Sequence, residues 1–204
     1  MDDDSKTSAL LQRATNGDPG ALGDLLMRDF DRLTRVVKFR MDSRLRGRID
    51  ASDVVQEAYV EATARFEEYK RDAKMPFFLW LRFLTLQKLF ELHRRHLNVK
   101  ARDVSREVAL YNGPLPEATS AVLAAQLIGK LTTPTQAAVR AEMKVQLEDA
   151  LNSMDAIDRE VLALRHFEQL TNAEASRVLG INESAASNRY VRAAKRLRMI
   201  FDSK

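Results

Sequence analysis

The stretch that decides the fold runs from Thr171 to Ala186 and reads TNAEASRVLGINESAA. Its order is a capping residue, a short helical run, a glycine, an apolar turn residue and a polar cap before another helix. Gly180 suits a helix end where the backbone takes a positive φ, and Ile181 is expected to anchor the turn in the core. Thr171 or Ser184 is expected to accept orphan amide hydrogens at a helix start. The stretch therefore predicts a helix-turn-helix.

The helix after this turn concentrates positive charge. Between Ala141 and Glu183 four basic residues stand against nine acidic ones, whereas the final helix has no acid from Ser184 until Asp202. Its basic residues are Arg189, Arg192, Lys195, Arg196 and Arg198. Arginines near a helix C-terminus can simply complement the helix dipole and stay solvated. A basic second helix in this motif nevertheless favours DNA binding.

The position of each residue along that helix separates two kinds of DNA contact. The N-terminal residues of the second helix face base edges in the major groove, and phosphate contacts are expected further along. The candidates for base contacts are Ser184, Ser187, Asn188 and Arg189. The candidates for phosphate contacts are Arg192, Lys195 and Arg196. Ala185, Ala186 and Tyr190 are expected to pack inward.

Three helices are predicted in the first half of the chain. The first covers residues 19–46, opens with Pro19 and repeats apolar residues every three or four positions. The second begins near Asp50 or Ser52, either of which can cap it, and carries its apolar residues on one side. The third begins at Pro76 and is unusually rich in large apolar side chains.

Acidic residues recur on the second of these helices. Asp53, Glu57 and Glu61 are four residues apart, so their carboxylates are expected to form one exposed stripe in which like charges repel. A solvated acidic face is one interpretation, and a docking surface for a basic partner is the other. The spacing alone leaves both open.

Aromatic and basic residues crowd the third helix. The aromatic residues are Phe77, Phe78, Trp80, Phe83 and Phe90. Most of them are expected to be core, but an exposed ring beside basic residues would let an unstacked base stack on it, and Trp80 is the candidate for this role. The basic neighbours are Lys70, Arg71 and Lys74 before the helix and Arg94 and Arg95 at its end.

These patterns predict an all-α protein made of two small helical domains joined by a flexible linker. The first domain covers residues 1–97, the linker 98–133 and the second domain 134–204. The linker contains a breaker at residues 112–116, and its Ala-rich residues 118–131 have the propensity for one short helix. The helices expected in the second domain cover residues 134–153, 155–167, 171–179 and 184–201.

Composition excludes several kinds of site. The 204 residues include no Cys, which excludes a disulfide framework, a thiolate zinc site and a cysteine nucleophile. No phosphate-binding Gly-rich loop, HExxH helix or nucleophile elbow is present, and His93 and His96 lack a carboxylate or thiol to complete a metal site. We therefore expect no enzymatic activity, cofactor or metal. The acidic start and the lack of roughly 20 consecutive apolar residues predict no export signal, no membrane insertion and a cytoplasmic location.

Two parts of the sequence resemble one known family. Residues 50–57, DASDVVQE, resemble region two of bacterial sigma factors, and residues 180–189, GINESAASNR, with residues 195–198, KRLR, resemble region four. Both regions occur in the right order, with no room for a region-three domain between them. The chain is therefore similar to the compact extracytoplasmic-function subfamily, and the resemblance covers residues 8–97 and 141–201.

The resemblance implies a sigma factor that binds core RNA polymerase and directs promoter recognition, promoter opening and transcription initiation. It implies that Asp53, Gln56 and Glu57 dock on the coiled-coil clamp of the polymerase large subunit, and the full set of candidate polymerase-binding residues adds Asp50 and Glu61. The third helix and the loop before it would open the minus-ten promoter element, and the last helix would read the minus-thirty-five element. An anti-sigma protein is a further candidate partner.

Two other classes remain as alternatives. One is a helix-turn-helix transcriptional regulator whose N-terminal helices receive a signal or a partner, and the other is a helical adaptor that binds only proteins. The basic final helix argues against the adaptor. The acidic stripe joined to a basic aromatic helix argues against the simple regulator.

Overall fold

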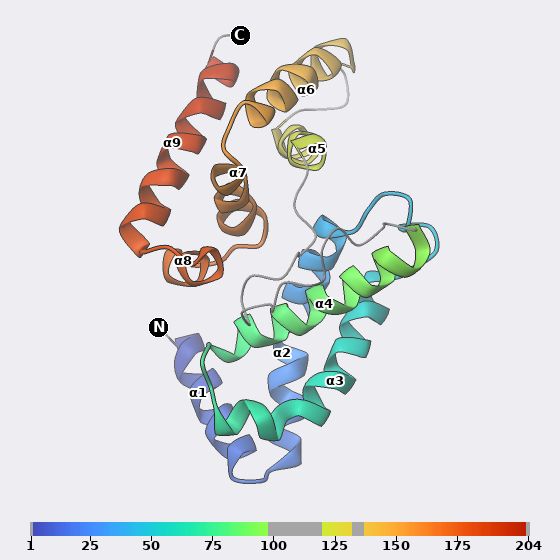
Figure 1. The fold of residues 1–204 in the computed structure, drawn as a ribbon, viewed down its shortest axis with the longest axis vertical. Coiled ribbons are helices and arrows are strands. Elements are labelled where there is room, and N and C mark those ends of the chain that lie inside the picture. The colour runs from blue at the N-terminus through green and yellow to red at the C-terminus, as the bar shows by residue number, and fades with distance from the viewer. Residues whose placement is uncertain (1, 98–119, 132–136, 203–204) are drawn as a thin grey trace. The chain divides into compact units, whose positions relative to one another are not determined.

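The computed structural model describes residues 2–97, 120–131 and 137–202, and within these ranges it is helical with connecting turns and has no strand (Figure 1). The all-α prediction is confirmed. The chain divides into two compact units, residues 1–116 and 117–204. The breaker predicted at residues 112–116 and the helix start predicted at Pro134 lie outside the described residues.

The core of the first unit lies where three of its helices meet. Its helices are α1 (Asp2–Thr15), α2 (Pro19–Arg40), α3 (Ala51–Arg71) and α4 (Phe77–Leu97). Figure 1 shows α4 lying across α2 and α3, and it packs against both. Leu81, Leu84 and Leu89 of α4 are fully buried, as are Leu33 of α2 and Val55 of α3. Burying side chains of this size supplies the main stabilising free energy of such a bundle.

Local signals explain where α2 and α3 begin. Asp18 caps α2 by accepting hydrogen bonds from the backbone N–H groups of Gly20 and Ala21, at 3.0 and 3.2 Å. Asp50 caps α3 by accepting from the backbone N–H and the hydroxyl of Ser52, at 2.9 and 2.8 Å. The hydrogen bond from the Ser52 N–H holds the pKa of Asp50 below its ordinary value. The predicted start of the second helix is confirmed, with Asp50 as the cap.

The end of α2 differs from the prediction. The helix expected over residues 19–46 stops at Arg40, and Met41 leaves it in an extended conformation. Asp42 then accepts a hydrogen bond from the backbone N–H of Arg44 at 2.9 Å, an Asx turn that competes with continued helix. The predicted helix end is therefore wrong, because the apolar periodicity continues beyond Arg40 although the helix does not.

Helix α1 was not predicted from the sequence. It packs against α2, where Ala14 is buried, and Arg13 forms an ion pair of 2.7 Å with Asp18 in the turn between the two helices. Its first turns carry three acidic residues and no large apolar side chain, so the amphipathic signal is confined to its end.

The second unit places the helix-turn-helix on three supporting helices. Its elements are α5 (Ser120–Leu131), α6 (Ala137–Asn152), α7 (Ala156–Leu162), the π-helical turn η1 (Ala163–Phe167), α8 (Asn172–Leu179) and α9 (Glu183–Asp202). Helix α9 packs against α6, α7 and α8. Helix α5 lies within the predicted linker, yet it packs against α6 and buries Leu123 and Ala124.

The turn between α8 and α9 is formed as the sequence predicts, except that Ile181 is not buried in the core and Ser184 is not the cap of α9. Thr171 and Glu174 form a capping box at the start of α8, and Gly180 ends that helix with a φ of 66°. Ile181 is half-buried, and its N–H donates to the carbonyl of Ser176 at 3.1 Å. Asn182, and not Ser184, caps α9 by accepting from a backbone N–H of its first turn at 2.7 Å. The short amide side chain directly before the helix has the better geometry for this bond.

Candidate functional site

The outward face of α3 carries two carboxylates without cationic partners. Asp53, Gln56 and Glu57 are exposed, while Val54, Val55 and Ala58 are buried on the opposite face. None of the ion pairs between described residues involves Asp53 or Glu57. The exposed Val60 lies on the same face as Gln56 and Glu57, one turn further along. This face therefore presents negative charge beside an apolar side chain.

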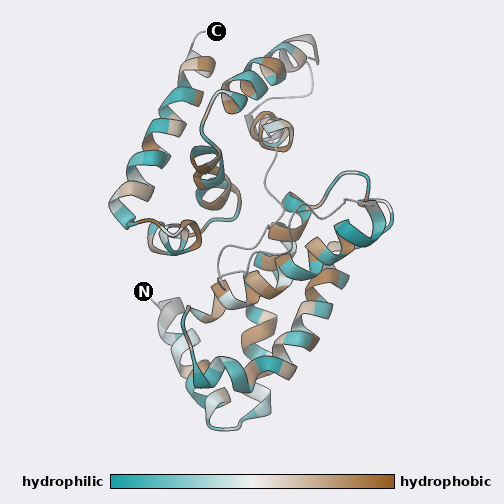
Figure 2. Ribbon diagram, in the orientation of Figure 1, coloured by the Kyte–Doolittle hydropathy of each residue, from teal (hydrophilic) through white to brown (hydrophobic). Residues whose placement is uncertain are grey.

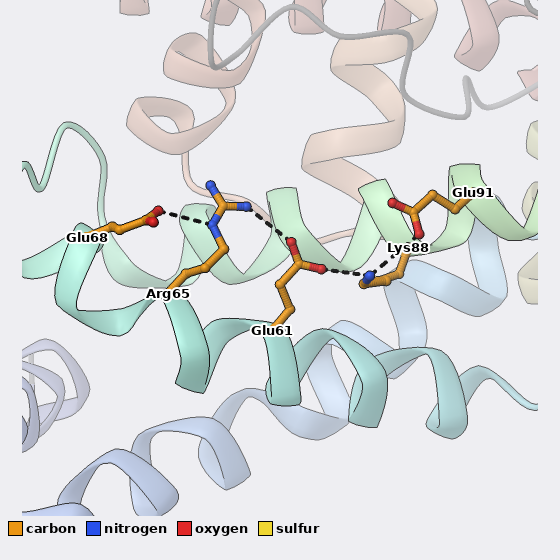
Figure 3. A network of polar contacts seen from close by, with 5 residues as sticks. All are labelled: Glu61, Arg65, Glu68, Lys88 and Glu91. Atoms are coloured by element: carbon orange, nitrogen blue, oxygen red, sulfur yellow. Dashed lines mark hydrogen bonds and ion pairs between the residues drawn. The ribbon is translucent and has the colours of Figure 1, made fainter.

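Glu61 does not belong to this exposed stripe. Its carboxylate lies between α3 and α4, where Arg65 binds one oxygen at 3.1 Å and Lys88 binds the other at 2.8 Å (Figure 3). Arg65 also contacts Glu68 at 3.3 Å, and Lys88 contacts Glu91 at 3.5 Å. The expectation of an uncompensated stripe is thus wrong at Glu61, because a lysine from another helix neutralises it. Its contacts join α3 to α4.

The titration of this pair follows from its contacts. Partial burial alone would raise the pKa of Glu61, but hydrogen bonds from Lys88 and Arg65 outweigh burial and hold that pKa below its ordinary value. The hydrogen bond to Glu61 raises the pKa of Lys88. Both groups are therefore charged across the neutral range and attract each other.

The basic residues before α4 are partly compensated. Lys70 lies 2.5 Å from Glu67 and 5.6 Å from the centre of the Phe66 ring. Lys74 pairs with Asp72 at 2.6 Å. The exposed Arg71 donates to the backbone carbonyl of Glu67 at 3.3 Å. These contacts are all local. Arg71 and the Lys74–Asp72 pair are exposed, so their contacts are weak and can be exchanged for a phosphate, whereas the Lys70 side chain is only 19% exposed.

Trp80 does not have the expected exposure. It is only 7% exposed and stacks on Tyr69, with 4.7 Å between ring centres. Phe77 packs edge-on to Tyr69 at 5.6 Å and lies 5.6 Å from Trp80, and Phe66 lies beside Phe77 at 6.3 Å. The Tyr69 hydroxyl donates to the carbonyl of Met75 at 3.0 Å. Trp80 is therefore part of the core that joins α3 to α4.

The far end of α4 is basic and exposed. Arg94, Arg95 and His96 are all exposed. His93 is half-buried, and its Nε2 accepts a hydrogen bond from the backbone N–H of Asp42 at 3.2 Å. Burial lowers the pKa of His93, which favours the neutral imidazole that this hydrogen bond requires. In the part of the chain that the structure describes, no group of three or more metal-ligating side chains comes together.

Helix α9 has a buried face and a polar face. Ala186, Ala193 and Leu197 are buried, and Tyr190 is half-buried near Arg165, whose guanidinium lies 5.5 Å from its ring centre. Ser184, Ser187, Asn188, Arg192, Lys195 and Arg196 are exposed. Hydrophilic residues recur along the whole length of α9 in Figure 2. The predicted inward packing of Ala186 is confirmed, and most candidate DNA contacts share the outward side.

Arg189 lies apart from the other base-contact candidates. It is half-buried, and its Nη1 donates to Asp158 of α7 at 2.6 Å, with Asp155 at 4.0 Å. Arg192 reaches the second oxygen of Asp158 at 3.4 Å. Arg196 donates to the hydroxyl of Ser153 at 2.8 Å. Arg189, Arg192 and Arg196 therefore line the flank of α9 that faces α7 and the turn before it.

Two residues of these surfaces were not found by sequence reasoning. Val60 could have been noticed as an apolar residue outside the buried face of its helix. Asp158 could not, because it lies 31 residues before Arg189 and only the fold brings the two together.

Comparisons with known proteins agree with this arrangement. Residues 144–197 match the family described as Sigma-70, region 4. The RNA polymerase sigma factor NccH of Alcaligenes xylosoxydans xylosoxydans is 26% identical over 208 residues, covering 100% of this chain and 98% of NccH. The ECF RNA polymerase sigma factor SigD of Mycobacterium tuberculosis (strain ATCC 25618 / H37Rv) is 26% identical over 193 residues, covering 95% of this chain and 82% of SigD.

A solved structure supports the fold. The structure of CnrH in complex with the cytosolic domain of CnrY matches with a TM-score of 0.53 and 22% sequence identity, covering 98% of this chain and 99% of that chain.

The helix-turn-helix unit and the full-length relatives together define the class: the chain is an RNA polymerase sigma factor, which directs transcription initiation. SigD is named as an extracytoplasmic-function sigma factor, so within this class the chain is similar to that subfamily. Its partners are accordingly core RNA polymerase and promoter DNA. In the described ranges no helix has both the length and the apolar character needed to span a membrane.

Proposed function

We propose that this sigma factor docks on core RNA polymerase through the outward face of α3, formed by Asp53, Gln56, Glu57 and Val60. The proposal rests on the different surroundings of the acidic residues along α3. Glu61 is neutralised by its contacts, whereas Asp53 and Glu57 stay exposed with no cation beside them. Exposed like charges contribute little to folding, but they favour association with a basic partner. Val60 would add an apolar contact to this surface.

We further propose that the second unit binds the minus-thirty-five element through α9. Ser184, Ser187 and Asn188 are exposed in the first turns of the helix, where side chains of a helix-turn-helix reach base edges. Lys195 and Arg196 lie two turns further on, where contacts to phosphate are favoured. The half-buried Arg189 enters this proposal as a residue that fixes α9 on α7.

For the first unit, the proposal assigns opening of the minus-ten element to the basic residues on either side of α4. They are Lys70, Arg71, Lys74, Arg94 and Arg95. Arg94 and Arg95 are exposed at the end of α4, and the ion pairs of Lys70 and Lys74 are with neighbours on the surface. Such pairs contribute at most about 1 kcal/mol each, so phosphates can displace them. Trp80 is excluded from base capture by its burial.

The proposal includes a regulatory protein partner. CnrH was solved with the cytosolic domain of CnrY, and an anti-sigma protein that holds this chain in a comparable complex is the corresponding expectation. The site of action would be the cytoplasm, where RNA polymerase works. We assign no catalytic step to the chain, because the polymerase is the enzyme.

Charge reversal tests the docking surface. The double variant Asp53→Lys/Glu57→Lys should weaken binding to core RNA polymerase at least tenfold at low salt, with unchanged helicity. The matched control is Asp24→Lys/Asp31→Lys, which makes the same charge change at two exposed positions on α2. Affinity is measured by titrating labelled sigma factor with core enzyme. Equal affinities of the two double variants would refute the assignment of the docking surface to α3.

A further inference from the structure

Asp158 holds two of the basic side chains of α9. Its side chain is only 13% exposed. One carboxylate oxygen accepts from Arg189 Nη1 at 2.6 Å, and the other faces Arg192 Nη2 at 3.4 Å. A carboxylate with two oxygens on two guanidinium groups offers them the same kind of acceptor as a phosphate.

The two arginines differ in what they can reach. Arg189 is half-buried against α7, so it fixes the carboxylate in place. The side chain of Arg192 is 65% exposed, and its contact with Asp158 is longer than that of Arg189. Arg192 can therefore leave Asp158 for an external anion while Arg189 keeps the carboxylate in position.

We propose that Asp158 is a built-in competitor of promoter phosphate for Arg192. This inference rests on the proposed role of α9 in DNA binding. In free holoenzyme the carboxylate neutralises Arg192, and DNA binding requires that Arg192 exchanges Asp158 for a phosphate. Asp158 thereby lowers the affinity of α9 for DNA and removes part of its salt dependence.

The competition has a distinguishing property. Phosphates carry no sequence information, so releasing Arg192 strengthens binding to every upstream sequence by the same factor. A residue that positioned the base-contacting side chains would instead change the preferred sequence. Uniformity across sequences therefore separates competition from positioning.

The variant Asp158→Asn tests this in reconstituted holoenzyme. Asparagine keeps the shape and can still accept a hydrogen bond from Arg189, but it removes the charge that attracts Arg192. The expected result is binding about two- to fivefold tighter. The slope of log affinity against log salt should steepen by up to about 0.9, the contribution of one phosphate contact.

A matched control is available on the same helix terminus. Asp155 lies 4.0 Å from Arg189, has a side chain 78% exposed and makes no capping hydrogen bond. Asp155→Asn removes an equal charge close by without removing a direct competitor, so the affinity gain should be much smaller. Affinities are measured by fluorescence anisotropy for a promoter fragment and for fragments with altered minus-thirty-five elements, at several salt concentrations.

A double-mutant cycle identifies the arginine involved. In the presence of Arg192→Ala, the substitution Asp158→Asn should no longer tighten binding. A second comparison avoids changing Asp158 at all. Because Arg192 is already partly neutralised, Arg192→Ala should reduce the salt slope less than Lys195→Ala does.

The outcomes separate failure of the inference from failure of the proposed function. Unchanged or weaker binding of Asp158→Asn, an altered base preference, or an equal gain from Asp155→Asn would overturn the inference. A larger loss of salt slope in Arg192→Ala than in Lys195→Ala would overturn it too, even if Asp158→Asn did not fold. If Asn188→Ala and Lys195→Ala both left DNA binding unchanged, the role of α9 itself would be refuted.

Discussion

Replacing Glu61 by glutamine should weaken the first unit without weakening polymerase binding. Glutamine keeps the size of the side chain and its ability to accept from Arg65 and Lys88, but it removes the charge that both cations share. The same substitution at Glu57, one turn earlier on the exposed face, should have the opposite profile. The pair of variants therefore separates folding from docking on one helix.

The expected magnitude follows from exposure and geometry. The side chain of Glu61 is 26% exposed, so its ion pairs are partly shielded from water. Exposed pairs contribute about 0.2 to 1 kcal/mol, and hydrogen bonds to charged groups about 1.5 to 3 kcal/mol. Because the amide still accepts hydrogen bonds, Glu61→Gln should lose about 1 kcal/mol of unfolding free energy. For a domain of this size that corresponds to about 4 °C in melting temperature.

The loss should depend on pH in a defined direction. The pKa of Glu61 is lowered in the folded state, so its stabilising contribution is present above the ordinary value of 4.5 and is lost as pH falls through the folded-state pKa. The pKa of Lys88 is raised, so its contribution is present below 10.5 and is lost as pH rises through the folded-state pKa. The difference between wild type and Glu61→Gln should therefore be greatest near neutral pH.

Fluorescence of the chain's one tryptophan is a suitable assay. Trp80 lies in the core between α3 and α4, so its emission during urea unfolding reports on the first unit within the full chain. Titration with core polymerase provides the second measurement. Unchanged unfolding of Glu61→Gln together with weakened polymerase binding would show that Glu61 serves docking and that its ion pairs contribute no stability.

Three further predictions concern single residues. Gly180→Ala should lower the free energy of unfolding by about 1 kcal/mol, and backbone strain alone is the cause, because φ is 66° and no atom lies within 4 Å of an added Cβ. Unfolding followed by circular dichroism measures this loss, which should be smaller for Gly180→Asn. Trp80→Ala should lower the free energy of unfolding by about 3 to 5 kcal/mol in the same assay, because it removes a buried ring stacked on Tyr69. An unchanged melting temperature would contradict the core position of Trp80. Hydrogen bonds from Arg44 lower the pKa of Asp42 to about 2, so stability should fall as pH drops from about 4 to 2, and Asp42→Asn should abolish that component of an acid titration.

The helices that could be predicted are those whose limits are encoded locally. Asp50 caps α3, Thr171 caps α8 and Gly180 ends it, as expected from the residue types alone, whereas the capping-box role of Glu174 was not predicted. The start of α1 carries no comparable apolar pattern, and this helix is stabilised by packing against α2. The end of α2 was placed too late because the side chain of Asp42 forms a turn within an apolar periodicity.

The sequence could predict which helix faces carry the candidate site, but not which side chains contact one another there. Spacing identified the acidic face of α3 and the polar face of α9. It could not show that Trp80 packs on Tyr69, because an aromatic ring satisfies a core and a base-stacking role equally well until its neighbours are known.

A periodic spacing describes one helix, whereas the charge state of a surface depends on its neighbours. Asp53, Glu57 and Glu61 are equivalent in spacing, yet Lys88 of α4 neutralises only the last of them. Arg189 likewise differs from its neighbours on α9 because Asp158 of α7 binds it tightly. In both cases a charge from a second helix converts a candidate contact residue into one that joins two helices. The residues left for partners are therefore those that the fold leaves exposed, either unpaired or in weak surface pairs, and this subset emerges only when the helices are packed.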